Sequence, residues 1–389
     1  MHRLLSGLLL GFLMLLAGCA PSEHESIRLA LAGEAVNLDP RFTTDATSAR
    51  INRLIFARLV DFDEHAQPQP ALATWEVLAP TYFRFHLGTE HRRFHDGTRL
   101  TSRDVKATYD FILDPENASP HRAMLDLIER IDVVDDDTLD VFLERADPLL
   151  PAYMVIGILP ERLARQPPQP EFVPVGSGPL MYLGRPEPGT TQLRRQADGQ
   201  VIEVVRVPDA TVRVLKLLRG EVDLLQNDLP AELITYLAQH PDIQVWRATG
   251  NNFAYLGFNL EDPDTGRLEV RQAVAHALDR EAIIKYVLDE SARLAGALLP
   301  PEHWAGHPDL KGISHDPQRA RQLLAEAGYG PERPLQLTYK TSNDAVRIRL
   351  ATVIQDQLAK VGIQVQLQTY DWGTFYGDIK AGRFQLYSL

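Results

Sequence analysis

The residues of this chain that could do chemistry include three histidines gathered in one short stretch. His86, His91 and His95 lie close together in the sequence, a density that would suit a metal site. Their spacing matches no standard zinc pattern, because His86 falls on the polar face of a predicted strand and the other two flank a basic turn. We therefore expect no metal ion at these histidines.

Three consecutive aspartates at positions 135–137 resemble a calcium loop only in their charge. A calcium loop also needs a glycine and a distal glutamate, and this stretch has neither, so we expect a solvated turn between two strands. The sequence also lacks a nucleophile elbow, a Walker loop, an H-E-x-x-H motif and paired C-x-x-C motifs. We expect a binding protein without a cofactor, and an enzyme is the alternative that these absences disfavour.

The position of Cys19, the one cysteine of the sequence, indicates what chemical role it has. A short basic start and an apolar run of about a dozen residues, fewer than the roughly 20 of a membrane-spanning helix, are typical of a secretory signal peptide. The stretch Leu16-Ala17-Gly18-Cys19 matches a bacterial lipobox. We expect a lipoprotein signal peptide at 1–18 and a lipidated tether at 19–26. The alternative is an ordinary signal peptide and a buried, inert cysteine.

Length and composition indicate a globular protein of more than one domain. The chain has 389 residues, of which 44% are hydrophobic and 24% are charged, and a chain of this length usually forms two or three domains. Its formal net charge of −12 argues against nucleic acid or an anionic membrane surface as a partner. Contact with a membrane is therefore expected through the lipid anchor only.

Residue periodicity predicts the elements that would position a site. Ile27–Leu31 and Tyr82–Leu87 alternate between apolar and polar residues as strands do, whereas Ala46–Val60 has the spacing of a helix. Thr101 or Ser102 is a suitable cap for another helix. These segments predict a mixed α/β protein.

The clearest fold signal lies towards the C-terminal end. Leu335–Tyr339 alternates as a strand, residues 344–361 have helical spacing with Asp344 as cap, and Ile363–Leu367 alternates as a second strand. Asp316-Pro317 starts a further helix upstream. Strand, helix and strand in succession form the unit of an α/β lobe.

Six stretches, in the correct order along the chain, resemble motifs of the extracytoplasmic solute-binding proteins of peptide/nickel-type ABC transporters. This family includes oligopeptide- and dipeptide-binding proteins. The stretches are Asn37-Leu38-Asp39-Pro40, then Phe85-His86-Leu87 with Phe94-His95-Asp96-Gly97 and Ser102–Val105, then Gly176-Ser177-Gly178-Pro179, Tyr255–Asn259, Val270–Arg280 and Leu323–Tyr329. Each stretch alone is a weak signal, and together they are a strong one.

The resemblance implies an α/β, two-lobe periplasmic-binding-protein-like fold in which an extra subdomain is inserted into the first lobe. We expect the first lobe at 27–53 and 176–265, the inserted subdomain at 54–175 and the second lobe at 266–389. In the family the chain returns at its end to complete both lobes, which implies that the C-terminal part is missing from this sequence. Phe384–Leu389 reads as the start of an apolar strand, so we expect unpaired strand edges there.

The resemblance also implies which residues contact the ligand in the first half of the chain. Thr44, Asp45 and Ala46 stand where family members lend backbone groups to the ligand. The alternative is a loop in which Asp45 or Thr44 caps the next helix. Gln226 and Asn227 stand where polar side chains enter the cleft, and a surface loop is the alternative.

Two aromatic residues complete the implied site. Tyr255 lies on a hinge strand and points either to the cleft or into a core. Trp372 stands where a family tryptophan lines the ligand pocket, although tryptophan more often belongs to a core.

The function that the resemblance implies is delivery of a peptide-like solute to the permease subunits and ATPases of an ABC importer. A cleft that binds an extended peptide can use backbone hydrogen bonds and tolerate varied side chains. We expect an exported, membrane-anchored lipoprotein on the periplasmic side of a bacterial envelope. The alternatives are a non-peptide solute, such as a metal complex, an opine, a sugar or a haem-like molecule, and a sensor or chaperone-like binder without transport.

Overall fold

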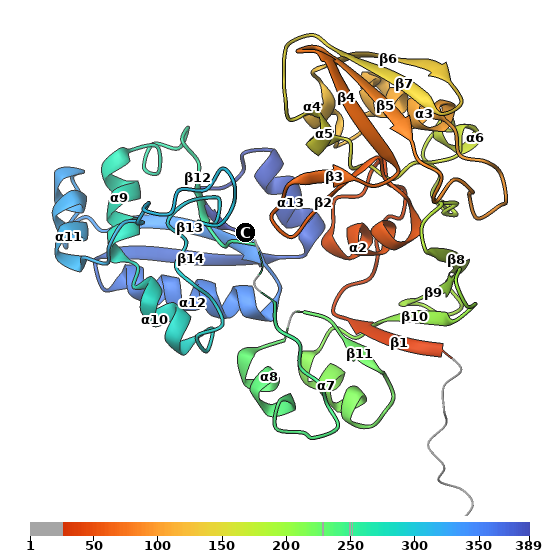
Figure 1. Cartoon of the computed structure of the whole chain (residues 1–389). Coiled ribbons are helices and arrows are strands. Elements are labelled where there is room, and N and C mark those ends of the chain that lie inside the picture. Colours follow the sequence, from red (N-terminus) through yellow and green to blue (C-terminus); the bar gives the residue numbers. More distant parts are fainter. Residues whose placement is uncertain (1–25, 228, 249, 251) are drawn as a thin grey trace, which may run out of the picture. The chain divides into compact units, whose positions relative to one another are not determined.

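The computed structural model describes residues 26–389 apart from 228, 249 and 251, and the chain divides into two compact units (Figure 1). The first unit extends to Asn227 and the second begins at Asp228. We expected the boundary between lobes at 265/266. The boundary between the two compact units lies earlier, and the strand Leu256–Phe258 pairs within the sheet of the second unit. The assignment of the lobes stays a prediction.

The first unit contains a five-stranded sheet of order β11-β1-β10-β9-β8. Its strands are β1 (Ser26–Leu31), β8 (Leu180–Gly184), β9 (Thr190–Arg195), β10 (Val201–Arg206) and β11 (Leu224–Leu225). The strand predicted at the start of the chain is confirmed as β1, which runs parallel to both of its neighbours, β10 and β11. Parallel strands bring their carboxyl ends to the same edge of a sheet, so the segments after β1 and β11 leave it side by side.

Helices α2 (Ala46–Ile55) and α7 (Ala210–Leu218) pack on this sheet. We predicted that the first of them would extend to Val60, and this is wrong, because the backbone turns to an extended conformation at Phe56. The carbonyl oxygen of Ile55, which would accept the amide of the next helical turn, accepts the Gly178 amide at 2.8 Å instead. A contact from a distant segment therefore ends the helix.

A second sheet in the first unit has the order β4-β5-β7-β6 and is antiparallel throughout (Figure 1). Its strands are β4 (Ala73–Ala79), β5 (Tyr82–Leu87), β6 (Ile128–Asp135) and β7 (Thr138–Leu143). Helix α3 (Ser102–Leu113) packs against it, and together they enclose the largest apolar core of the unit. The strand predicted at 82–87 and the cap at Thr101 are confirmed.

Short elements complete the first unit around these two sheets. They are β2 (Val60–Phe62), β3 (Pro68–Pro70), the 3-10 helix η1 (Pro115–Asn117), α4 (Arg122–Leu125), α5 (Leu150–Tyr153) and α6 (Glu161–Ala164).

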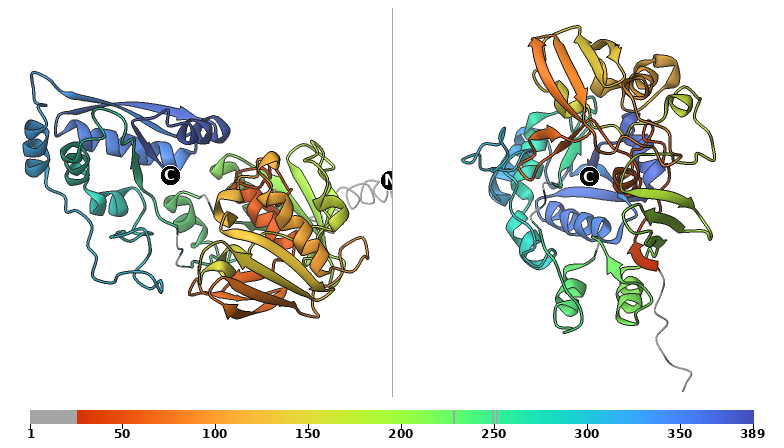
Figure 2. Two further views of the ribbon diagram at one scale, coloured as in Figure 1. Left: turned by 90° about the horizontal axis from the view of Figure 1, so that it is seen from above. Right: turned by 45° about the vertical axis from the view of Figure 1, so that its right-hand side comes forward.

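The second unit contains a four-stranded sheet of order β12-β15-β13-β14. Its strands are β12 (Leu256–Phe258), β13 (Leu335–Ser342), β14 (Ile363–Tyr370) and β15 (Leu386–Ser388). The predicted strand–helix–strand unit is confirmed, with β13 and β14 parallel and α12 (Ala345–Ala359) between them, alongside both strands in Figures 1 and 2. The other helices are α8 (Ala231–Leu237), α9 (Leu268–Ala277), α10 (Arg280–Tyr286), α11 (Pro317–Glu326) and α13 (Trp372–Lys380).

Strand β15 corrects the expectation of an unpaired apolar strand at the end of the sequence. It lies inside the sheet, antiparallel to β12 on one side and parallel to β13 on the other. Its apolar residue Leu386 is fully buried in a core shared with α9, α11 and α12. The edges of this sheet are β12 and β14.

Within the part of the chain that the structure describes, no helix is both long enough and apolar enough to span a membrane.

Candidate functional site

Gln226 and Asn227 lie at the carboxyl edge of the five-stranded sheet, directly after β11. Because Ala30 lies opposite Leu225 in the parallel pair, the chain leaves β1 next to these two residues. Both side chains are exposed, and Asn227 has a left-handed backbone with φ of 56°. In open α/β sheets, ligands bind outside the carboxyl ends of the strands, so this edge is a candidate binding surface.

Helix α2 begins beside the same edge. A Cβ at Gly33, two residues after β1, would lie 3.1 Å from the Thr47 hydroxyl, so the first turn of the helix meets the end of the strand. Asp45 is the cap, because its carboxylate accepts the Ser48 amide at 2.8 Å. That side chain therefore has a structural role, as in the alternative interpretation, while Thr44 and Ala46 are exposed on either side of it.

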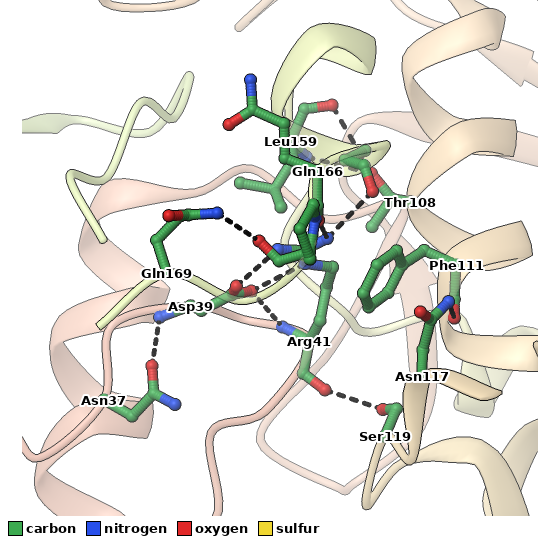
Figure 3. Close-up of polar contacts among 12 residues, drawn as sticks. Asn37, Asp39, Arg41, Thr108, Phe111, Asn117, Ser119, Leu159, Gln166 and Gln169 are labelled. Atoms are coloured by element: carbon green, nitrogen blue, oxygen red, sulfur yellow. Dashed lines mark hydrogen bonds and ion pairs between the residues drawn. The ribbon is translucent and has the colours of Figure 1, made fainter. Parts of the chain in front are cut away.

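A buried ion pair fixes the turn that leads into this segment (Figure 3). The Arg41 guanidinium donates to both carboxylate oxygens of Asp39, at 2.9 and 2.6 Å, and to the carbonyl oxygens of Ala164 and Gln166, each at 2.9 Å. Its central carbon lies 3.9 Å from the centre of the Phe111 ring. The turn is thus joined to α3 and to the end of α6, and sequence reasoning missed Arg41 because these partners are distant in the chain.

Thr43 extends this hydrogen-bond network to the exposed segment at residues 44–46. Its hydroxyl lies 2.9 Å from the Asp39 carbonyl oxygen and accepts the Asn52 side-chain amide at 2.6 Å. Thr43 and Asn52 are both buried. The backbone that would meet a ligand at residues 44–46 is therefore preorganised before any ligand binds.

His95 has structural hydrogen-bond partners in the Gly176–Gly178 segment. Its Nε2 atom lies 3.0 Å from the Gly178 carbonyl oxygen, and its backbone amide donates to the Gly176 carbonyl oxygen at 2.8 Å. Burial lowers the pKa of His95, although the Gly178 carbonyl favours the protonated form. His86 is 3.7 Å from Glu76 on the sheet surface. Among the described residues no group of histidine, cysteine and acidic side chains could hold a metal ion.

The aspartate stretch forms the turn between β6 and β7, as predicted from the sequence. Arginines neutralise it: Asp137 accepts from Arg92 at 2.5 Å and from Arg99 at 2.9 Å, and Arg103 lies 3.6 Å from Asp136. The contacts with Arg92 and Arg99 lower the pKa of Asp137, chiefly through the hydrogen bond from Arg92.

Tyr255 and Trp372 lie at the carboxyl edge of the second sheet. Strand β12 is antiparallel to β15, so the residue before it meets the carboxyl end of β15, and the Tyr255 amide donates to the Leu389 carbonyl oxygen at 3.1 Å. Trp372 starts α13 directly after β14. The exposed fractions are 38% for Tyr255 and 40% for Trp372, so neither is a core residue.

Further aromatic rings accompany these two residues. The Trp372 ring stacks on Tyr376, with centroids 5.5 Å apart and planes inclined by 8°. The Tyr255 hydroxyl lies 3.4 Å from that of Tyr387, whose pKa is raised to about 12 by burial and by Tyr255. Sequence reasoning missed Tyr376 and Tyr387. The structure thus places Tyr255 and Trp372 on one sheet edge of the second unit and Gln226 and Asn227 on one sheet edge of the first. Thr44, Asp45 and Ala46 lie at the start of α2, whose first turn meets the segment after β1.

Comparison with known proteins decides the family. Residues 66–389 match the family model described as bacterial extracellular solute-binding proteins, family 5 Middle. This chain belongs to that family. The sequence resemblance is therefore confirmed, and the two-lobe, α/β periplasmic-binding-protein fold expected from it is the fold of this solute-binding protein.

Named relatives span most of this solute-binding protein. Heme-binding protein A of Haemophilus influenzae is 28% identical over 93% of this chain and 74% of its own length. The dipeptide-binding protein of Escherichia coli is 27% identical over 91% of this chain and 73% of its own length. The solved structure of AgaA from A. tumefacien R10 with agropinic acid is 29% identical, with a TM-score of 0.83 over 94% of this chain and 76% of that one.

Cys19 and the rest of the expected signal peptide lie outside the described residues. The lipid attachment predicted there stays a prediction.

Proposed function

We propose that this solute-binding protein captures a peptide-like solute on the periplasmic side of a bacterial envelope and delivers it to an ABC importer. The observation that carries the proposal is that Gln226, Asn227, Tyr255 and Trp372 lie next to carboxyl ends of strands, where such folds bind ligands. Residues 44–46 lie at the start of the helix whose first turn meets the segment after β1. The exposed segment 44–46 offers backbone groups to an extended peptide. The named dipeptide-binding relative supports the same solute class.

A non-peptide solute is the second candidate. A relative named for heme binding is as similar to this chain as the dipeptide-binding one, at 28% against 27% identity, and a structural neighbour holds an opine-type acid. Overall similarity therefore supports a solute-binding role without selecting the solute.

A thermal-shift screen tests the solute class. A ligand that binds only the folded protein raises Tm in proportion to the logarithm of its concentration above Kd. We expect dipeptides or short oligopeptides to raise Tm, and isothermal titration calorimetry of the best peptide to give one site per chain. A shift with haem, an opine or a nickel–histidine complex, and with no peptide, would replace the peptide proposal by the second candidate. Uptake of a labelled peptide, lost when the gene is deleted and restored by the intact gene, separates import from sensing.

We also propose that Cys19 carries the membrane anchor. Cys19→Ser should abolish lipid attachment and shift the protein from the membrane fraction to the soluble fraction, or leave it uncleaved. A single acyl chain binds membranes only weakly, so stable anchoring needs more than one chain. Metabolic labelling with a palmitate analogue should mark wild type and miss the variant. Equal labelling and equal fractionation of both proteins would refute the anchor.

A further inference from the structure

Four aromatic rings form a continuous row along strands β12 and β15. Phe253 packs against Tyr255 with ring centroids 5.5 Å apart, Tyr255 meets Tyr387 edge-to-face at 5.8 Å, and Tyr387 meets Phe384 edge-to-face at 4.8 Å. Phe253 and Tyr255 precede β12, whereas Phe384 and Tyr387 lie before and within β15. The sheet brings them together, because β12 and β15 are neighbours. These four residues are called the aromatic row below.

Gly257 provides the space for the aromatic row. In the β12–β15 pair Gly257 lies directly opposite Tyr387, and a Cβ at Gly257 would lie 2.1 Å from a ring carbon of Tyr387. The tyrosine ring therefore lies over the backbone of β12, where a side chain would otherwise stand. From this position it reaches the Tyr255 ring at the carboxyl edge of the sheet.

The aromatic row carries no charge. The hydroxyls of Tyr255 and Tyr387 lie 3.4 Å apart and can hydrogen-bond to each other, so the rings remain as the accessible surface. Lys340 in β13 lies directly opposite Tyr387, and its ammonium lies 2.7 Å from the Asp378 carboxylate. An anionic group placed on the rings would lose hydration without gaining a partner, whereas an aromatic group would gain ring contacts.

We propose that the aromatic row is a specificity subsite, in which Tyr387 selects solutes that carry an aromatic or large apolar side chain. The inference rests on the proposed function, because it assigns a preference to the sheet edge where the solute is proposed to bind. Tyr255, with 38% of its surface exposed, is the ring that the solute meets first. Tyr387 supports it and extends the apolar surface along β15.

Isothermal titration calorimetry with three dipeptide probes, Ala-Phe, Ala-Ala and Ala-Asp, tests the preference. Wild type should bind Ala-Phe about ten-fold more tightly than Ala-Ala, and Ala-Asp most weakly, since one good ring contact changes an affinity by roughly three- to ten-fold. Tyr387→Ala should reduce the Ala-Phe to Ala-Ala ratio to about two-fold, while Tyr387→Phe should retain it. Tyr286→Ala, at a tyrosine that is 71% exposed in the same unit, is the matched control and should retain the ratio.

The outcomes separate this inference from the proposed function. Wild type that binds the peptides without an aromatic preference, or a preference that Tyr387→Ala leaves unchanged, overturns the subsite and leaves peptide binding standing. Wild type that binds none of the three dipeptides overturns the subsite, and it overturns peptide binding as well when no oligopeptide raises Tm in the thermal-shift screen. If Tyr387→Ala does not fold by circular dichroism, Tyr387→Leu, which keeps an apolar side chain in the strand, takes its place with the same expected loss of the ratio.

Discussion

Replacing Arg41 by methionine should strongly destabilise the first unit. Only 1% of the Arg41 side chain is exposed, and its guanidinium donates two hydrogen bonds to Asp39 and one each to the Ala164 and Gln166 carbonyl oxygens. Methionine keeps much of the aliphatic length and removes every donor. The Asp39 carboxylate, with 3% of its side chain exposed, would then be a buried charge without its cation.

The expected magnitude follows from that burial. Removing one partner of a buried ion pair costs about 3–5 kcal/mol, because the remaining charge stays desolvated. The two carbonyl oxygens that lose a donor add to this cost, and local relaxation with entry of water subtracts from it. We expect a loss of about 4 kcal/mol in the free energy of unfolding. The double variant Arg41→Met with Asp39→Asn should lose less, about 2 kcal/mol, because it leaves no buried charge.

Arg130→Met is a matched control. The Arg130 guanidinium carbon lies 3.8 Å from the centre of the Phe142 ring and pairs with Glu129 and Asp132, so its contacts are of the same kind as those of Arg41. Its side chain is 47% exposed, however, and exposed pairs contribute about 1 kcal/mol or less. Burial is therefore the difference that the two variants compare.

Urea unfolding measured by circular dichroism gives the two free energies. Hydrogen exchange of helix α3 assigns the transition to the first unit, which matters because the two units need not unfold together. With a slope of about 3 kcal/mol per molar urea, a loss of 4 kcal/mol lowers the midpoint by about 1 M. Equal midpoints for Arg41→Met and Arg130→Met would refute the reasoning, and so would a double variant less stable than Arg41→Met alone.

Two further predictions concern the same unit. Gly176→Ala should lower the free energy of unfolding by about 3 kcal/mol, because its Cβ would lie 2.0 Å from the Ile55 carbonyl oxygen. Gly88→Ala is the control, and it should cost less than about 1 kcal/mol because the atom nearest to its Cβ would be 3.6 Å away. Calorimetry compares the two variants, and equal Tm values would contradict the steric argument. Stability should also fall as the pH drops below about 6.5, because burial lowers the pKa of His95 and His121 in the folded protein. Above this pH both histidines are neutral in the folded and the unfolded states. Below it the unfolded chain binds protons that the folded chain takes up only at lower pH, so the unfolded state is favoured. His95→Gln should flatten the dependence of Tm on pH in this range, and an unchanged slope would show that His95 does not contribute.

Much of the secondary structure was predictable because its signals are local. The caps Thr101, Asp316 and Asp344 all begin helices in the structure, and each cap is a contact between residues three positions apart. The strands at 335–339 and 363–367 were equally clear, since alternation reports a sheet with one buried face. Such signals need no knowledge of the rest of the chain.

The errors have a common cause, which is dependence on distant segments. The end of α2 at Ile55 depends on the Gly178 amide, and the pairing of β15 depends on β12 and β13, which lie far upstream. Apolar periodicity indicates that a segment is buried, and it does not indicate which partner buries it. The length of α2 and the order of the strands were therefore beyond the sequence, although the presence of α2 and of a strand at the end of the sequence was within it.

The residues of the candidate site also differ in whether their signals are local or depend on distant segments. The resemblance could place Tyr255 at a ligand edge, because the Tyr255–Asn259 stretch carries its own signal in the sequence. It could not show the aromatic row, because Tyr387 reaches Tyr255 only when Gly257 lies opposite it, and that register is set by the pairing of β12 with β15. When a binding surface is formed by several strands, the register between the strands determines which residues lie together. Residues that contact one ligand therefore need no regular spacing in the sequence. The preference of this solute-binding protein is accordingly expected to follow from the residues opposite its recognisable motifs, and less from the motifs themselves.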